Sequence, residues 1–163
     1  MSIRAATDAD ASRGQNALER ADLRLAALLP ALKAAPPVDA ARWVVVDVVR
    51  GPTGQAAVFE QGLSNAEFGL SPHNWIPSFA AEVYPVDAGE RVLPAGHPAY
   101  DQLQTIAAGL GLRTGAAWGD FGHVEVPGWL EEVREVRARV APSSAVLPFL
   151  LLAGVLLVRR SRA

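Results

Sequence analysis

Apolar residues recur at helical spacing in two stretches of the chain. Leucines about three and four residues apart run through residues 16–33, and a similar pattern runs through residues 100–110. This spacing predicts two amphipathic helices, each covering a core with one face. A pair of prolines at positions 36 and 37 ends the first helix, and glycines at positions 109 and 111 close the second.

Three other stretches are rich in β-branched and aromatic residues, namely residues 42–49, 79–84 and 121–126. That composition predicts strands. A shorter helix, residues 54–61, is expected between the first two strands, with Thr53 as its cap. Together these elements predict an α+β fold in which helices flank a small antiparallel sheet.

The two ends of the chain differ from this middle part. Residues 1–14 are small and polar, which predicts a flexible N-terminus before a domain at residues 15–128. Residues 129–141 carry acidic and basic side chains three and four positions apart. This pattern predicts an amphipathic connecting helix.

Residues 142–163 are expected to form a hydrophobic helix with a basic end. No residue between positions 145 and 158 is charged, and arginines follow it. Reaching back to position 140, the stretch approaches the ~20 residues of a membrane span, and arginines stay on the cytoplasmic side. We therefore expect a membrane-associated protein whose domain lies outside the cytoplasm. The alternative is a hydrophobic helix packed on the domain. The N-terminus lacks the apolar run of a signal peptide, so the export route stays open.

The amino-acid composition limits the kinds of functional site that the chain can form. A chain of 163 residues fits one domain with its own core. Its net charge of −2 carries no signature of nucleic-acid binding. Because the chain has no cysteine, a disulfide framework is excluded, and any metal must be held by histidines and carboxylates.

Two imidazoles and one carboxylate are the candidates for a metal site. His73 precedes a predicted strand, Glu82 lies within that strand, and His123 lies in the last strand. A zinc hydrolase needs three protein ligands and an open position for water, and this trio can supply the ligands. For Glu82 alone, surface alternation explains the pattern equally well. The remaining histidine, His97, is expected to begin a helix or to lie at the surface.

Two more carboxylates stand close to His123 in the sequence. Asp120, three residues before it, is the candidate general base, which would take a proton from water and hand it to the leaving amine. Glu125 shares a strand face with His123 because side chains alternate with period two, so it is a candidate to orient the imidazole. Spacing of this kind also occurs by chance, so by itself it identifies no function.

Two motifs resemble those of the zinc D-alanyl-D-alanine carboxypeptidases and phage L-alanyl-D-glutamate endopeptidases, which cut the stem peptides of bacterial peptidoglycan. Their first motif, Ser-x-His followed by a small residue, any residue and Asp, is similar to residues 71–73 and 80–82. Their second, Asp-x-x-His-x-Glu after Trp-Gly, is similar to residues 118–125. The likeness covers residues 15–127.

The resemblance implies a peptidase with Zn²⁺ on the sheet and a general base beside it. The implied ligands and base are His73, Glu82, His123 and Asp120. In two respects the chain departs from the family. The metal carboxylate is usually Asp where this chain has Glu82, and its distance along the chain from His73 is two residues longer than usual.

The resemblance also implies a substrate-binding wall. Arg50, at the end of a predicted strand, would face the substrate, with Gln55 and Ser71 lining the site. Without the resemblance, a solvated strand end explains Arg50.

The expected function is hydrolysis of peptidoglycan stem peptides by a monomeric, endolysin-like zinc peptidase. The lack of obvious insertions that would close one end of a cleft favours an endopeptidase over a carboxypeptidase. Two other functions stay open. A non-catalytic cell-wall-binding module is favoured by Glu82 in place of Asp, and a membrane-linked structural spacer is favoured only by the tail. Retention of both motif histidines and of Asp120 favours the enzyme.

Overall fold

The structure, a computed structural model, describes residues 3–14 and 17–140. The chain divides into two compact units, residues 1–132 and 133–163, and the boundary falls inside the last helix. The sheets and the candidate site lie in the first unit.

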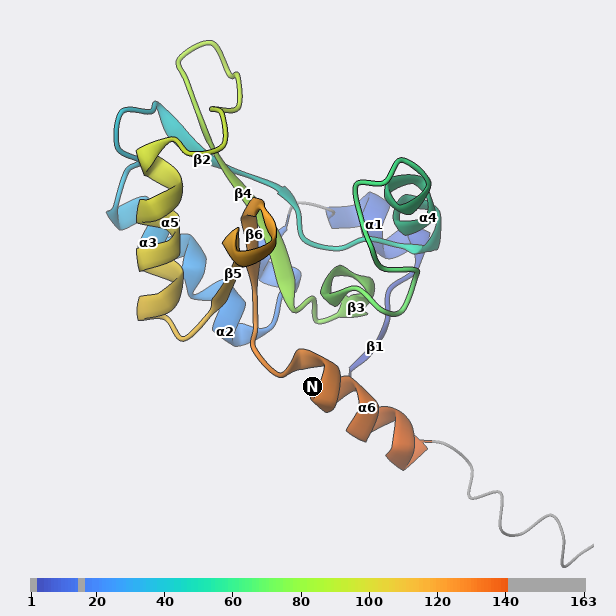
Figure 1. Cartoon of the computed structure of the whole chain (residues 1–163). Helices are drawn as coiled ribbons and strands as arrows, with labels where there is room; N and C mark the ends of the chain where they lie inside the picture. Colours follow the sequence, from blue (N-terminus) through green and yellow to red (C-terminus); the bar gives the residue numbers. More distant parts are fainter. Residues whose placement is uncertain (1–2, 15–16, 141–163) are drawn as a thin grey trace, which may run out of the picture. The chain divides into compact units, whose positions relative to one another are not determined.

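A four-stranded antiparallel sheet forms the centre of the first unit (Figure 1). Its strands lie in the order β2, β4, β6 and β5, so β2 and β5 are the edges. The strands are β2 (Arg42–Asp47), β4 (Ala80–Val86), β5 (Arg113–Gly115) and β6 (Asp120–Glu125). The predicted α+β class with a small antiparallel sheet is confirmed. The predicted strands correspond to β2, β4 and β6, with shifts of one or two residues at their ends.

The register of this sheet brings charged side chains into adjacent rows. Glu82 on β4 lies opposite both Asp47 on β2 and His123 on β6, and a β-bulge in β2 sets the position of Asp47. In the next row, Glu125 on β6 lies opposite Arg113 on β5. Residues directly opposite one another, and residues two apart on one strand, share a face. All five side chains therefore project from the same face of the sheet.

The other face of the sheet carries the core. Val83 and Val124 are fully buried there. Helix α5 (Pro98–Gly109) packs against β4 and β6 and contributes the buried Leu103. Helix α3 (Leu28–Ala34) lies beside α5 (Figure 1). The amphipathic helix predicted at residues 100–110 is confirmed.

The prediction of one continuous helix at residues 16–33 is wrong. Within the described part of that segment, the chain forms a 3-10 helix (Leu18–Arg20), then α2 (Leu23–Ala26), then α3. The break occurs because Asp22 starts a new helix, its side chain accepting a hydrogen bond from the backbone N of Arg24. The leucine pattern still marks the core, because these side chains are buried: Leu18, Leu25, Leu28 and Leu32.

The N-terminal segment predicted to be flexible, residues 1–14, contains a strand and a helix within its described residues 3–14. Strand β1 (Arg4–Ala5) pairs antiparallel with β3 (Trp75–Ile76), and helix α1 (Asp8–Gly14) follows. Asp10 of this helix is 1% exposed and forms ion pairs with three arginines, which are Arg4, Arg13 and Arg20. Asp10 is therefore used in ion pairs rather than in solvation.

Helix α4 (Pro52–Glu60) begins two residues earlier than predicted, with Gly51 as its N-cap residue. Thr53 does not cap the helix. Instead, its backbone N and its hydroxyl donate to the carboxylate of Asp8 in α1, at 2.9 and 2.8 Å. A side chain at Gly51 would collide with Asp8. Helix α1 thus fastens the start of α4.

Helix α6 (Trp129–Val140) corresponds to the connecting helix predicted at residues 129–141. Within residues 3–14 and 17–140, no helix has the length and apolarity that crossing a bilayer requires. The hydrophobic helix predicted at residues 142–163 lies outside the described residues. Membrane association and the location of the domain therefore stay predictions.

Candidate metal centre

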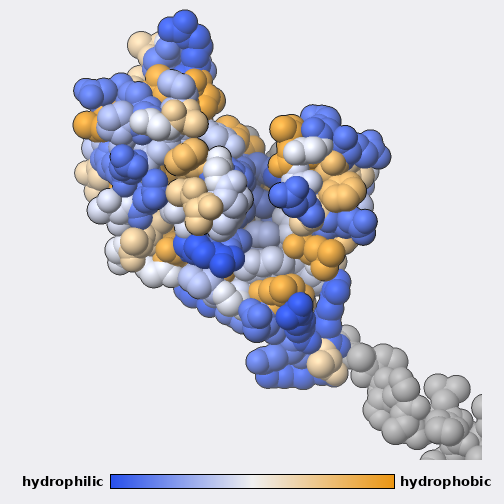
Figure 2. All heavy atoms as spheres, viewed as in Figure 1, coloured by the Kyte–Doolittle hydropathy of each residue, from blue (hydrophilic) through white to orange (hydrophobic). Residues whose placement is uncertain are grey.

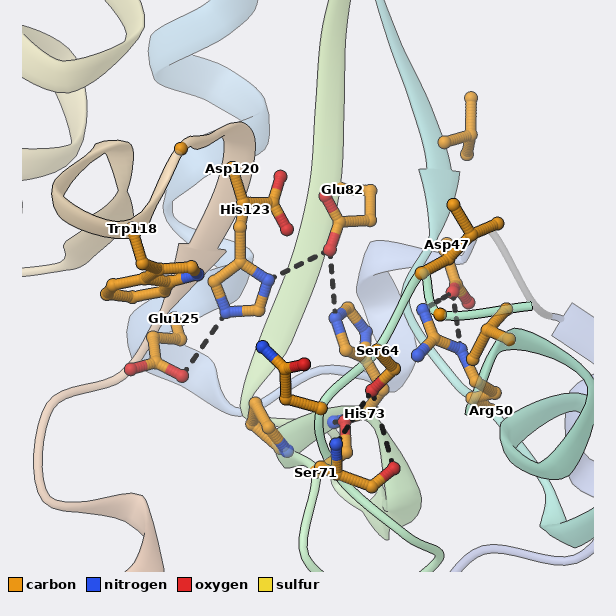
Figure 3. Close-up of a pocket in the computed structure, with 18 of the residues that line it drawn as sticks. Asp47, Arg50, Ser64, Ser71, His73, Glu82, Trp118, Asp120, His123 and Glu125 are labelled. Carbon is orange, nitrogen blue, oxygen red and sulfur yellow. Dashed lines mark hydrogen bonds and ion pairs between the residues drawn. The ribbon is translucent and has the colours of Figure 1, made fainter. Parts of the chain in front are cut away.

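Three side chains from three segments converge on the face of the sheet opposite Val83 and Val124. They are His73, from a 3-10 helix (Pro72–Asn74), Glu82 of β4 and His123 of β6. Glu82 Oε1 lies 3.2 Å from His73 Nε2 and 2.8 Å from His123 Nδ1 (Figure 3). One donor atom from each residue lies within 4.8 Å of the others, and all three residues are buried. The structure therefore brings the three predicted ligands together.

The spacing of these atoms fits a tetrahedral ion. Ligands about 2.0–2.2 Å from zinc lie roughly 3.4 Å from one another, close to the 2.8 and 3.2 Å between Glu82 and the two imidazoles. The other ring nitrogen of each histidine has a different partner. His73 Nδ1 lies 3.2 Å from the carbonyl oxygen of Val48, and His123 Nε2 lies 3.2 Å from Glu125 Oε2. Because a carbonyl and a carboxylate accept hydrogen bonds there, His73 Nε2 and His123 Nδ1 are the atoms that can face a metal.

The charges within the cluster stabilise one another. Burial raises the pKa of Glu82, but hydrogen bonds with His123 and His73 outweigh it and hold that pKa well below its usual range. Burial lowers the pKa of His123, but its bonds to Glu125 and Glu82 outweigh it and raise that pKa to about 9. A buried, ionised carboxylate needs a cation nearby. A proton on the His123 imidazole supplies that charge, and a metal ion can replace it.

Asp120, the candidate base, stands at the start of β6 and directs its carboxylate into the same space as that of Glu82 (Figure 3). Burial and the neighbouring charge of Glu82 raise the pKa of Asp120, against the opposing influence of His123 and His73. A carboxylate with a raised pKa, beside a cluster of metal-ligand type, is suited to take up and release a proton.

Tyr84 adds a hydroxyl that the sequence analysis missed. Its Oη donates to Glu82 Oε2 at 3.3 Å. Burial and the charges of Glu82 and Asp120 raise the pKa of Tyr84, so the hydroxyl stays protonated. The ring packs against Gly122 of β6, where any side chain would collide with it. Alternation along β4 places Tyr84 on the face of Glu82, and that signal was available in the sequence.

The cluster lies on the floor of an open cleft of about 770 Å³. One wall follows the sheet and includes Trp118 and Asp120, and the other follows the end of α4 and the loop after it, including Leu63 and Ser64. Figure 2 shows this face hollowed between the surface over α4 and the surface over the sheet. A cleft of this volume accommodates a ligand the size of a short peptide.

Arg50 lines the second wall, but its guanidinium is already engaged. Its Nε donates to Asp47 Oδ2 at 2.8 Å, its Nη2 binds the same oxygen, and its Nη1 donates to Gln55 Oε1 at 3.1 Å. Gln55 is fully buried, and its Nε2 donates to Ser64 Oγ and to the carbonyl oxygen of Ala66. The expectation that Gln55 lines the site is therefore corrected. It supports Arg50 and the loop from behind, because every polar atom of its amide is bonded to protein.

Ser71 and Asn74 fix the turn that carries His73. Ser71 lines the cleft, and its Oγ accepts a hydrogen bond from the backbone N of His73 at 3.4 Å. Together with Asn74 it forms a capping box, so the Ser-x-x-Asn spacing was a usable signal. Asn74, which the sequence analysis missed, is fully buried and donates to the carbonyl oxygen of Arg50 at 3.0 Å and to Gln55 Oε1 at 3.1 Å.

Two further sequence expectations concern Glu125 and His97. Glu125 is buried behind His123. Burial raises its pKa, but bonds with His123 and Arg113 outweigh it and lower that pKa. The carboxylate lies within hydrogen-bonding distance of the His123 ring, and its role in orienting that ring stays a prediction. His97 is the N-cap residue of α5, where its Nδ1 accepts from the backbone N of Ala99 at 3.3 Å.

The fold is similar to that of a solved structure. The crystal structure of the L-Ala D-Glu endopeptidase ChiX from Serratia marcescens matches with a TM-score of 0.50 and 20% sequence identity, over 71% of this chain and 86% of that chain. At this identity the likeness establishes the fold alone. No protein-family model matches the sequence, and no curated protein matches it significantly.

Proposed function

We propose that this protein is a zinc-dependent peptidase that hydrolyses the stem peptides of peptidoglycan. The observation that carries the proposal is the buried cluster of His73, Glu82 and His123, which opens on a cleft with Asp120 beside it. Two findings support it. The fold is similar to that of an L-Ala D-Glu endopeptidase, and the motifs at residues 71–82 and 118–125 resemble those of stem-peptide peptidases.

The donor set favours zinc as the cofactor. Two imidazoles and a glutamate, with a fourth position towards the cleft, form a known ligand set of catalytic zinc sites. When bound, zinc supplies a Lewis acid for the scissile carbonyl and makes water more acidic. Glu82 is therefore chemically competent in the position where the family usually has Asp. The register of β4 with β6 places its carboxylate beside His123.

The protein's own residues would carry the remaining steps. Asp120 would take the proton that the attacking water loses and deliver it to the leaving amine. Glu125 would keep the His123 ring in one orientation. Arg50, held by Asp47 and Gln55 on the opposite wall, would place a positive charge beside a substrate carbonyl or carboxylate.

The test combines metal analysis with a digest of purified peptidoglycan. The full chain is loaded with zinc, its metal content is measured, and peptides released from peptidoglycan are identified by mass spectrometry. Asp120→Asn is compared with Asp101→Asn, which alters an exposed carboxylate in α5. Because a general base is worth about 10²–10⁴-fold in rate, we expect Asp120→Asn to lose that factor while keeping its zinc, and Asp101→Asn to behave as wild type.

The released fragments also identify which peptide bond is hydrolysed. Fragments that end in L-alanine or begin with D-glutamate indicate an L-Ala D-Glu endopeptidase, and free D-alanine indicates a D,D-carboxypeptidase. A wild-type chain that holds no zinc after reconstitution, or that holds zinc and releases nothing, would refute the proposal. The first of these results would favour a non-catalytic cell-wall-binding module.

A further inference from the structure

A pair of charged side chains connects the metal centre with the edge of the sheet. Arg113 of β5 lies directly opposite Glu125 of β6. Its Nε donates to Glu125 Oε1 at 2.6 Å, and its Nη2 binds the same oxygen. The other oxygen, Oε2, lies 3.2 Å from His123 Nε2. Glu125 therefore uses one oxygen for Arg113 and the other for His123.

We propose that Arg113 is a positioning residue of the metal centre. By holding Glu125, it fixes the direction of the His123 ring and keeps the proton of that ring on Nε2, so that Nδ1 faces the ion. This inference rests on the metal site of the proposed function. It adds to that site a residue that touches neither the ligand cluster nor the substrate cleft.

Burial explains why one arginine can set the geometry. The Glu125 side chain is only 4% exposed, whereas that of Arg113 is 56% exposed. A buried carboxylate does not exchange partners with water, so its orientation is decided by the two groups that bind it. Without Arg113, one oxygen of Glu125 loses its described partner, and the side chain is free to rotate away from His123.

Trp118, which lines the cleft, contacts both Arg113 and His123. Its ring lies 5.6 Å from the Arg113 guanidinium carbon and 5.8 Å from the centroid of the His123 ring. Figure 3 shows Trp118, His123 and Glu125 side by side. The cation–π contact restricts Arg113 to the position in which it reaches Glu125.

Two effects of removing Arg113 oppose each other. The loss of a positive charge makes the surroundings of the ion more negative, which strengthens cation binding. The loss of the orienting pair weakens it. A half-exposed charge is screened by water and salt, whereas a group that orients a metal-ligating histidine is worth about 10–100-fold in affinity. The net result expected is therefore weaker zinc binding, and the sign of the change separates the two effects.

The test uses the full chain with Arg113→Ala and Arg113→Lys. Arg91→Ala is the control, because Arg91 is an exposed arginine paired with Asp87 outside the cleft. Zinc affinity is measured by competition with a chelator, ligand geometry by the absorption spectrum of the Co²⁺-loaded protein, and stability by thermal unfolding of the metal-free protein. We expect Arg113→Ala to weaken zinc binding about 10-fold or more and to alter the Co²⁺ spectrum. Arg113→Lys should recover part of both, and Arg91→Ala should change neither.

A second set of variants tests whether Arg113 acts through Glu125. In a Glu125→Gln background, Arg113→Ala should weaken zinc binding little further, because coupled residues are not additive. Full additivity would overturn the inference, as would unchanged or tighter zinc binding by Arg113→Ala. So would a weaker affinity with an unaltered Co²⁺ spectrum, because that result indicates a merely structural role. A wild-type chain that binds no zinc would overturn the proposed function itself, and this result needs no variant to be recognised.

Discussion

The two walls of the cleft hold their polar side chains in different ways. On the sheet wall, Glu82, His123 and Glu125 project from paired strands, and the backbone ladder sets their positions. On the opposite wall, Arg50 follows a strand and is held from behind by the buried Gln55 of α4, and side-chain hydrogen bonds from Asn74 support both residues. The difference indicates that, on the sheet wall, a substitution that shortens a polar side chain changes the chemistry with little effect on stability. Substitutions of the residues that support the opposite wall lower the stability of the fold before they affect the chemistry.

The largest effect is expected on the sheet wall, at Glu82. Glu82→Ala leaves two imidazoles and no carboxylate in the cluster. The binding free energy of a structural zinc ion is about 10–16 kcal/mol. An equal division among four ligands assigns about 3–4 kcal/mol to each, which corresponds to roughly 10²–10³-fold in affinity. Chelator competition measures the change, and Glu82→Asp, which keeps a carboxylate, should lose less. Wild-type affinity in Glu82→Ala would contradict the assignment of Glu82 as a ligand.

Behind the opposite wall, Asn74→Ala should lower the free energy of unfolding by about 3 kcal/mol, because it leaves several buried hydrogen-bonding groups without this partner. The Asn74 side chain donates to Arg50 and Gln55 and accepts from the backbone N of Gly69 and Ser71. Urea unfolding of the metal-free protein checks this. Asn65→Ala, an exposed change on the same wall, should stay within about 0.5 kcal/mol of wild type. Equal stabilities of the two variants would remove the distinction between the walls.

A steric change on the sheet wall should affect both stability and metal binding. In Gly122→Ala the added methyl group would collide with the Tyr84 ring, which donates to Glu82. Overpacking of this kind costs about 1–3 kcal/mol. Gly109→Ala is the matched control, because nothing lies within 4 Å of its new methyl group and alanine favours the helix. Unfolding and zinc affinity are measured for both. A Gly122→Ala protein as stable as wild type would show that the strands shift without cost.

The smallest effect on stability is expected at Asp10 of α1, the helix that contacts the start of α4. A hydrogen bond with Arg4, followed by others, holds the pKa of Asp10 well below its usual range against the effect of burial. Because this folded pKa lies below the unfolded value of about 3.9, the stabilisation is complete above that pH and is lost as the pH falls below it. Asp10→Asn should therefore cost about 1–2 kcal/mol at pH 7 and progressively less on acidification towards pH 3. Unfolding at both pH values tests this, with the exposed Asp101→Asn as control. A difference that is the same at both pH values would contradict the ion-pair explanation.

The local sequence pattern predicted much of the sheet wall. Strand-forming residues, the period of two along a strand and the absence of cysteine together point to Glu82, His123 and Glu125. These features are local, because residue type and alternation are written in consecutive positions. The same alternation also indicates Tyr84, which the sequence analysis missed. Local pattern predicted α5 and the helical character of the leucine-rich segment, although Asp22 divides that segment into shorter helices.

The sequence by itself therefore indicated three strands of the sheet, helices α4 and α5, the candidate donors and the α+β class. Only the tertiary structure decided which donors meet. The pairing of Arg113 with Glu125, and of Glu82 with His123, depends on strand register, which local periodicity does not specify. The pairing of Asp10 with Arg4 and Arg20 has the same cause, because a polar residue appears solvated until charges from other elements are brought to it. Long-range pairing, rather than residue type, is what converts these side chains into a site.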